Sequence, residues 1–305
     1  MRITGTILMN QALDAMRLTL GRLAKSQARI ASGRQVLSPA DDPAGQGSVT
    51  RLAARQSRID QWERQGERTR AYIETNDRLL ARLTEIVGRV QTLAVTGADG
   101  TQGATERAAL ATEVNDLLEE VSEIANSLDD GRYVFGGRET LTPPLVLTRN
   151  AQNQITAASW NPRGVDATRD IEIAEGVTVQ ANLGGTTVLG TAAATSFLPG
   201  VLITLRDRLA ANDGEGVRGT MTNLDGAAGR LNTVVAETGA RQRQVERALQ
   251  DLDDDRVATA AALSAIVDTD VARAATELSQ QEIAYQASLQ VAAKAIQPSL
   301  MDFIR

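Results

Sequence analysis

The residues in this chain best placed to do chemistry are two neighbouring carboxylates, Asp41 and Asp42, directly before Pro43. Such a pair can supply a general acid and a general base. An aspartate before proline is also a typical helix start, because its carboxylate accepts a hydrogen bond from the first turn and proline suits the first helical position. We therefore interpret the pair as the start of a helix and predict no catalytic residue.

Two other patterns resemble a calcium loop and a phosphate-binding loop, but each lacks residues that define such a site. A cluster of aspartates lacks the glycine at the sixth position and the closing glutamate of a calcium loop, so we interpret it as a solvated helix face. The cluster consists of Asp251, Asp253, Asp254 and Asp255. A glycine-rich segment has no strand before it and no Lys-Ser/Thr after it, so it fits a turn better than a phosphate-binding loop. Its glycines are Gly97, Gly100 and Gly103.

Basic residues form one further candidate site. Arg51, Arg55 and Arg58 lie on one face of a predicted helix, where they could bind an acidic partner, pair with carboxylates of the same chain or stay solvated. Of the 32 basic residues only Lys25 and Lys294 are lysines. We interpret this arginine bias as a consequence of genome composition.

The composition excludes several kinds of chemistry. The chain of 305 residues has no cysteine and no histidine, which removes thiol chemistry, disulfides, most zinc sites and the commonest general base. We expect no cofactor and no metal. A net charge of -6 disfavours nucleic-acid binding, which depends on clustered basic residues. No apolar run reaches the roughly 18 to 20 residues that cross a bilayer, so we expect no membrane insertion.

Apolar residues recur in alternating steps of four and three at both ends of the chain, which is the heptad spacing of paired helices. We expect the two ends to pair, or to pack against other molecules, through this predicted seam. Its residues are Met9, Leu13, Met16, Leu20, Leu23, Ile30, Val271, Leu278, Tyr285, Leu289, Ile296 and Phe303.

Between the two ends the pattern predicts long helices and a small β-rich insert. A helix of about 50 residues from Ala44 to Thr96 would be roughly 75 Å long. A compact globule of this chain length has a radius of gyration of about 19 Å, so we expect an elongated, mainly α molecule of antiparallel rods. A third helix is predicted from Thr105 to about Leu128, and the period changes to that of strands after Asp129-Asp130-Gly131.

These patterns predict three domains. Residues 1–42 with 268–305 form a terminal coiled-coil domain for assembly, and residues 43–137 with 195–267 form a rod of long helices. Residues 138–194 form the inserted outer domain, which is small and β-rich. An enzyme in this insert is one alternative, but the insert offers few acids or bases. Those acids are Glu139, Asp166, Asp170, Glu172 and Glu175.

Two motifs at opposite ends of the chain resemble the bacterial flagellin superfamily. The run Arg29 to Arg34 followed by Ser38 to Gly45 is similar to its N-terminal signature, and Asp268 to Ala272, Gln286 to Leu289 and Ser299 to Ile304 are similar to its C-terminal domain. Within the superfamily, Met1 to Ile3, Gly131 to Gly137 and Leu300 to Phe303 resemble the hook-filament junction branch more than filament flagellins. The motif residues that carry the resemblance are Ser32, Gly33, Asp41, Asp42, Ala44, Gly45, Asp270, Ala295 and Leu300.

The resemblance implies a structural, non-enzymatic protein of the bacterial flagellum, a ring of subunits that joins hook to filament and nucleates filament growth. Its implied partners are flagellin, the hook-side junction protein, further copies of itself, an export chaperone and the flagellar type III export apparatus. Export without a cleaved signal peptide would place the protein outside the cell, whereas the residues alone predict a cytoplasmic protein. The alternatives are a filament flagellin and a cytoplasmic coiled-coil scaffold.

Overall fold

The computed structural model describes the backbone of residues 2–301 and the side chains of residue 7 and residues 9–293. The described residues fold mainly into helices, with short antiparallel strands, and they form two compact units. One unit contains residues 1–59 and 254–305, and the other contains residues 60–253. The mainly α fold with a small β-rich region, expected from the sequence, is confirmed. The division into three domains stays a prediction.

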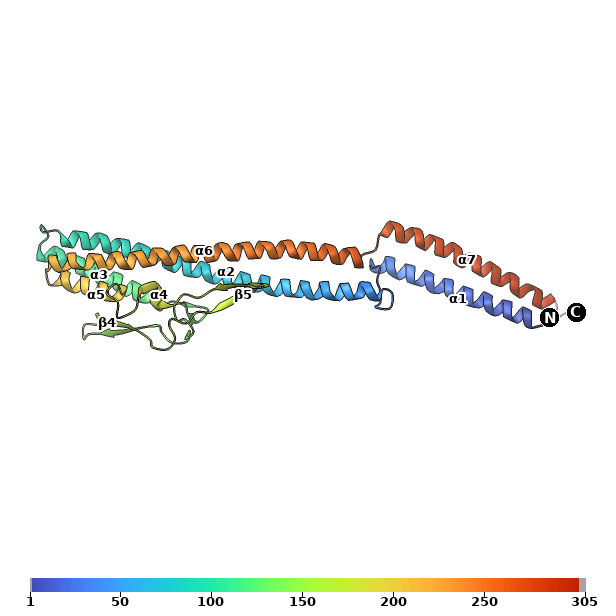
Figure 1. Cartoon of the computed structure of the whole chain (residues 1–305), viewed down its shortest axis with the longest axis horizontal. Coiled ribbons are helices and arrows are strands. Elements are labelled where there is room, and N and C mark those ends of the chain that lie inside the picture. Colours follow the sequence, from blue (N-terminus) through green and yellow to red (C-terminus); the bar gives the residue numbers. More distant parts are fainter. Residues whose placement is uncertain (1, 302–305) are drawn as a thin grey trace. The chain divides into compact units, whose positions relative to one another are not determined.

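In the unit of residues 1–59 and 254–305, helices α1 (Arg2–Ser32) and α7 (Val271–Met301) lie side by side (Figure 1). α1 ends at Ser32, and Gly33 follows it with a φ of 68° that suits glycine. The segments that follow α1 and precede α7 are joined by two backbone hydrogen bonds. Gln35 N donates to Val267 O at 2.7 Å and Thr269 N donates to Gly33 O at 2.9 Å.

Two long helices run through most of the remaining chain. α2 (Pro43–Ala98) has 56 residues, or about 84 Å at 1.5 Å a residue, and α6 (Gly214–Val267) has 54. α2 begins at Pro43, as the Asp42-Pro43 pair predicts.

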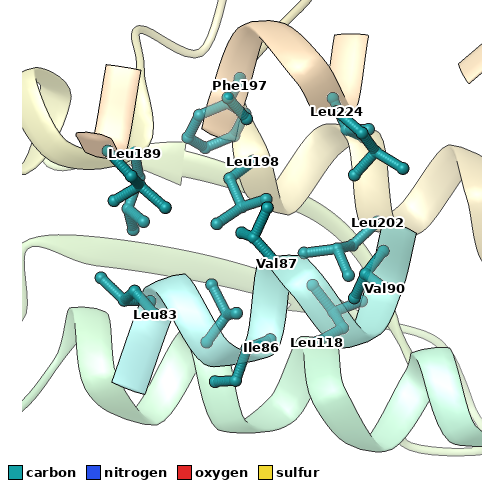
Figure 2. Close-up of a cluster of buried hydrophobic side chains, with 14 of the residues drawn as sticks. Leu83, Ile86, Val87, Val90, Leu118, Leu189, Phe197, Leu198, Leu202 and Leu224 are labelled. Carbon is teal, nitrogen blue, oxygen red and sulfur yellow. The ribbon is translucent and has the colours of Figure 1, made fainter. Parts of the chain in front are cut away.

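A four-helix core holds the unit of residues 60–253 together. α2 and α6 pack with α3 (Ala104–Ala125) and α5 (Leu198–Ala210), and Figure 2 shows their apolar side chains pointing toward one another. Leu83 and Leu118 are fully buried there, and Phe197 packs edge-on against Trp160 at 5.9 Å between ring centroids. Burial of such side chains stabilises the unit by about 1.5–3 kcal/mol each.

Three two-stranded antiparallel sheets and a short helix, α4 (Gly185–Leu189), lie between α3 and α5. β1 (Leu128–Asp129) pairs with β2 (Arg132–Tyr133), β3 (Leu145–Arg149) with β4 (Ile155–Trp160), and β5 (Asp170–Ala174) with β6 (Val177–Gln180). The sequence predicts a small β-rich insert that contains the last two hairpins, whereas α4 is a feature that it missed.

The predicted end of the third helix was wrong, since α3 stops at Ala125 rather than near Leu128. The cause is Asn126, whose amide pairs with the backbone of Leu145 as a strand would. Asn126 Nδ2 donates to Leu145 O and Leu145 N donates to Asn126 Oδ1, each at 2.9 Å. This tertiary contact draws the chain out of the helix.

Candidate assembly surface

Asp41 fastens the loop between α1 and α2 to α1. Its Oδ2 accepts hydrogen bonds from Leu37 N (3.2 Å) and Ser38 N (3.0 Å), and its Oδ1 lies 2.6 Å from Lys25 Nζ on α1. The hydrogen bond from Lys25 lowers the pKa of Asp41, and the two backbone donors act in the same direction. Both oxygens are engaged, so this carboxylate holds a loop in place.

Asp42 caps α2. Its Oδ1 accepts a hydrogen bond from Gly45 N at 2.9 Å, and a side chain on Gly45 would collide with the Asp42 carboxylate. Ala44 lies exposed in the first turn between them. Ser32 donates from Oγ to Ala28 O at 2.7 Å in the last turn of α1. These residues of the N-terminal motif therefore end one helix and start the next.

Asp270 has the same role at the start of α7. Its Oδ1 accepts hydrogen bonds from Ala272 N at 3.0 Å and Arg273 N at 3.2 Å. Ala295, Ile296 and Leu300 belong to α7, but their side chains lie outside those that the structure describes, and Phe303 lies outside the described residues.

One residue of the aspartate cluster and one of the three arginines meet within the unit of residues 1–59 and 254–305. Arg55 donates to both carboxylate oxygens of Asp255, at 2.9 and 3.0 Å, which is one of the alternatives open from the sequence. Both side chains are about half exposed, so the pair contributes little to stability. Among the residues that the structure describes, no group of three or more Asp and Glu side chains is arranged to hold a metal ion.

The glycine-rich segment is a turn that an arginine holds closed. Arg107, 7% exposed, donates to Gly97 O (2.8 Å) and Asp99 O (2.8 Å) from α3. It also donates to Asn212 Oδ1 at 2.6 Å, which links this turn to the turn between α5 and α6. Gly97 packs against Leu209, where a side chain would collide, and Gly103 is the cap of α3.

Two of the acids of the insert accept hydrogen bonds within it. Glu172 Oε1 accepts a hydrogen bond from Gly176 N in the β5–β6 turn at 3.2 Å, and Asp166 accepts one from the Thr186 hydroxyl. The neighbouring segment Gly131 to Gly137 is fixed by close backbone approach. Gly137 has a φ of 63°, and a side chain there would collide with the carbonyl oxygens of Gly164 and Val165.

The contact between α1 and α7 mixes small, polar and larger apolar residues. The less exposed positions of α7 follow steps of four and three, and they are Ala274, Leu278, Gln281, Tyr285, Ser288 and Ala292. On α1 they include Ala12, Met16, Thr19, Leu23, Ser26 and Ile30. The hydroxyls of Thr19 and Ser288 lie 3.2 Å apart and share a hydrogen bond across the pair.

Large apolar side chains point away from this contact. Leu18 is 57% exposed, Ile283 is 67% exposed and Val271 is 60% exposed. Others on the two helices are Ile7, Met9, Leu20, Leu289 and Val291. The pair therefore covers only part of its apolar surface and leaves much of the rest exposed, as expected of helices that pack against further molecules.

The predicted seam divides between these two surfaces. Its members that are half-buried are Leu13, Met16, Leu23, Ile30, Leu278 and Tyr285. Its members that are exposed are Met9, Leu20, Val271 and Leu289. Periodicity identifies the helices correctly but does not say which of two adjacent stripes the partner helix covers.

Sequence reasoning missed the buried arginines of the unit of residues 60–253. Arg206, 7% exposed, donates to Ile155 O on β4 at 2.7 Å and to Asn115 Oδ1 on α3 at 3.2 Å. Arg107 has the corresponding role at the turns. Each stands beside aliphatic residues in a helical pattern, but nothing in that pattern distinguishes it from the exposed arginines.

No helix in the described part of the chain is both long and apolar enough to cross a membrane.

Family models match both ends of the chain. The bacterial flagellin N-terminal helical region matches residues 3–140, and the bacterial flagellin C-terminal helical region matches residues 221–304. Together the two matches cover well over half of the sequence, and they leave out most of the region with the β3–β4 and β5–β6 hairpins.

Known proteins of two kinds are similar to this chain. The flagellar filament 31.3 kDa core protein of Treponema maltophilum is 25% identical over 272 residues, which are 89% of this chain and 88% of that protein. The flagellar hook-associated protein 3 of Escherichia coli K12 is 23% identical over 303 residues, covering 94% and 95%. In fold, the chain resembles the flagellar hook-associated protein 3 of Legionella pneumophila with a TM-score of 0.61, at 15% identity and with 72% and 98% covered.

Proposed function

The chain belongs to the bacterial flagellin family, and from this premise we propose that it is a structural component of the flagellum that joins the hook to the filament. The observation that carries the proposal is the α1–α7 pair, which leaves Leu18, Val271 and Ile283 exposed. Apolar surface of this kind marks a site of association with other molecules.

The motif residues support an assembly protein without catalytic chemistry. Asp41, Asp42 and Asp270 use their carboxylates to hold a loop and two helix starts. Arrays of rigid helices present fixed contacts, so one copy can meet a hook-side subunit at one surface and a filament-side subunit at another. The predicted seam, Met9 to Ile30 and Val271 to Phe303, is the region we assign to that assembly.

The hook-associated relative supports the junction role, because it is similar to this chain over nearly the full length of both proteins. In this role copies of the chain form a ring, with flagellin and the hook-side junction protein as neighbours. The protein is exported by the flagellar type III apparatus without a cleaved signal peptide, is held by an export chaperone beforehand, and works outside the cell.

Deletion of the gene tests this function. We expect cells that keep their hooks, lose their filaments and release flagellin into the medium, and we expect the intact gene to restore filaments. Filaments of normal length on the deletion strain would contradict the proposal.

A filament flagellin is the second candidate, and the Treponema relative, a filament core protein, favours it. Seeding the purified protein with filament fragments separates the two functions. A junction protein adds only a short end to each fragment, whereas a flagellin grows long filaments.

A further inference from the structure

Within the unit of residues 60–253, one side of α2 borders an acidic groove between α2 and α6. The groove has a volume of about 420 Å³ and is lined by Asp77, Ala81, Thr84, Glu85, Asn232 and Val235. Asp77 and Glu85 are exposed, and neither has a hydrogen-bond or ion-pair partner among the residues that the structure describes. Two unpaired carboxylates therefore lie at the edge of a groove whose other lining residues include the small side chains of Ala81 and Thr84.

Another side of α2 carries an arginine strip, formed by Arg64, Arg68 and Arg78. At 3.6 residues a turn, Arg64 and Arg68 lie about 135° around the helix axis from the α2 residues of the groove, and Arg78 lies at the edge of the strip nearest the groove. Arg64 and Arg68 are exposed and have no partner among the described residues, and Arg78 donates only to Thr75 Oγ1, at 3.0 Å. Further along the same side, Arg82 and Arg89 differ, since each pairs with a glutamate of α3 at 2.6 Å.

Two glycines extend the small floor of the groove. Gly88 lies one turn beyond Thr84 in α2, and Gly229 lies one turn before Asn232 in α6. A side chain on either would meet nothing within 4 Å, unlike Gly66, which packs against Leu249. Glycine destabilises a helix interior relative to alanine, so the isolated chain gives no packing reason for these two residues. Close approach of another molecule gives one.

We propose that neighbouring copies of this chain contact through these two sides of α2, with the arginine strip of one copy along the acidic groove of the next. Along the helix axis, Asp77 and Glu85 are about 12 Å apart, and Arg68 and Arg78 are about 15 Å apart. Long arginine side chains can make up this difference, so the arginines of one copy can reach the carboxylates of the next. The occupant is another copy because both charged surfaces belong to one helix and are complementary. Since the two surfaces differ, the contact repeats from copy to copy around a ring.

This inference rests on the proposed function, in which copies of the chain form a ring. It predicts that the contact weakens as salt concentration rises, because the charges at its edge are exposed to solvent.

Crosslinking tests the contact directly, because the chain has no cysteine of its own. Arg68→Cys and Glu85→Cys in one chain lie about 25 Å apart along α2, too far for a short bismaleimide to join them within one copy. In isolated flagella we expect this chain to give a ladder of crosslinked oligomers. The matched control combines Arg68→Cys with Arg218→Cys, an exposed arginine of α6, and should give no ladder.

Absence of the ladder, with antibody labelling of the same chain at the junction, would overturn the contact and leave the proposed function intact. Absence of the chain from flagella would overturn both.

Charge reversal gives an independent test. We expect filament assembly to be lost when the strip is reversed (Arg64→Glu with Arg68→Glu) and when the groove is reversed (Asp77→Arg with Glu85→Arg). Co-expression of the two variants should restore filaments, because each reversed surface then meets a complementary one. As a folding control, both variants should unfold at the same temperature as the wild type. Failure of folded variants to complement each other, or normal filaments from either alone, would contradict the contact.

Discussion

At the scale of residues, single carboxylates start two helices of this chain, α2 and α7. The Asp42 carboxylate accepts a hydrogen bond from Gly45 N in the first turn of α2. Because Gly45 has no side chain, the carboxylate can lie directly over the turn. The cap thereby joins two residues of the motif into one local structure.

Removing this cap should destabilise the protein. For Asp42→Ala we expect a loss of about 1 kcal/mol in the free energy of unfolding, the usual effect of losing a capping side chain. Asp42→Asn should retain most of the stability, since its amide oxygen can accept the same hydrogen bond. Urea unfolding measures both, and equal losses for the two variants would show that the cap is not the cause.

The ion pair between Lys25 and Asp41 predicts a dependence on pH. Because the pKa of Asp41 is lowered in the folded chain, its contribution is fully present above its ordinary value of 3.8 and is lost as the pH falls through the folded value. Comparison of thermal unfolding of the wild type and Asp41→Asn should therefore show a difference at neutral pH that disappears in acid. A difference that grows in acid would contradict this assignment.

Local residue roles could be predicted from the sequence, and long-range ones could not. Asp42 and Gly33 act on neighbours within three residues, so their types and positions suffice. Arg107 bonds to Asn212, more than a hundred residues away, and only the packed fold brings the two together.

At the scale of elements, Arg107 ties the α2–α3 turn to the α5–α6 turn. Arg107→Ala should destabilise the unit by an amount on the order of 3 kcal/mol, because it leaves the buried Gly97 carbonyl without its donor and unties the two turns. Arg163→Ala, at an exposed arginine in a loop, is the control and should change stability by less than about 0.5 kcal/mol. Differential scanning calorimetry compares the two, and equal small effects would mean that the turns close without Arg107.

The helices at the chain ends illustrate what periodicity resolves. Their steps of four and three identify α1 and α7 correctly. The stripe of larger apolar residues is a natural choice for the contact, but the structure places Ala274, Ser288 and Ala292 in it, where small side chains let the two helices approach. Val271 and Leu289, which belong to the predicted seam, remain outside. Hydrophobicity reports the period of a helix, and a partner decides which stripe is covered.

The outward residues should act on assembly and not on folding. For Leu18→Asn with Ile283→Asn we expect an unchanged free energy of unfolding of the single chain, within about 0.5 kcal/mol, because both side chains are already exposed. Incorporation into flagella should be lost. Leu23→Asn, in the helix contact, is the comparison and should destabilise the chain. Normal incorporation of the double variant would exclude this surface from assembly.

At the scale of the whole molecule, the succession of helices, hairpins and helices could be predicted, but not how the hairpins pack. The β5–β6 hairpin rests on α2 and α6 through Ile173 and Val179, which contact Ile73 and Val245. These residues come from three distant parts of the chain, and their apolar character alone does not predict which of them are in contact. The family resemblance carried by the two motifs therefore predicts the architecture better than the apolar pattern does.

Exposed apolar and charged surfaces on the helices of this protein are available for contacts with other subunits. We propose that these contacts place the protein between hook and filament. The most direct measurement is immunogold labelling of intact flagella, using an antibody against a tag that still permits motility. We expect a single band of gold at the boundary between hook and filament. Labelling distributed along the filament, or confined to the cytoplasm, would contradict the claim.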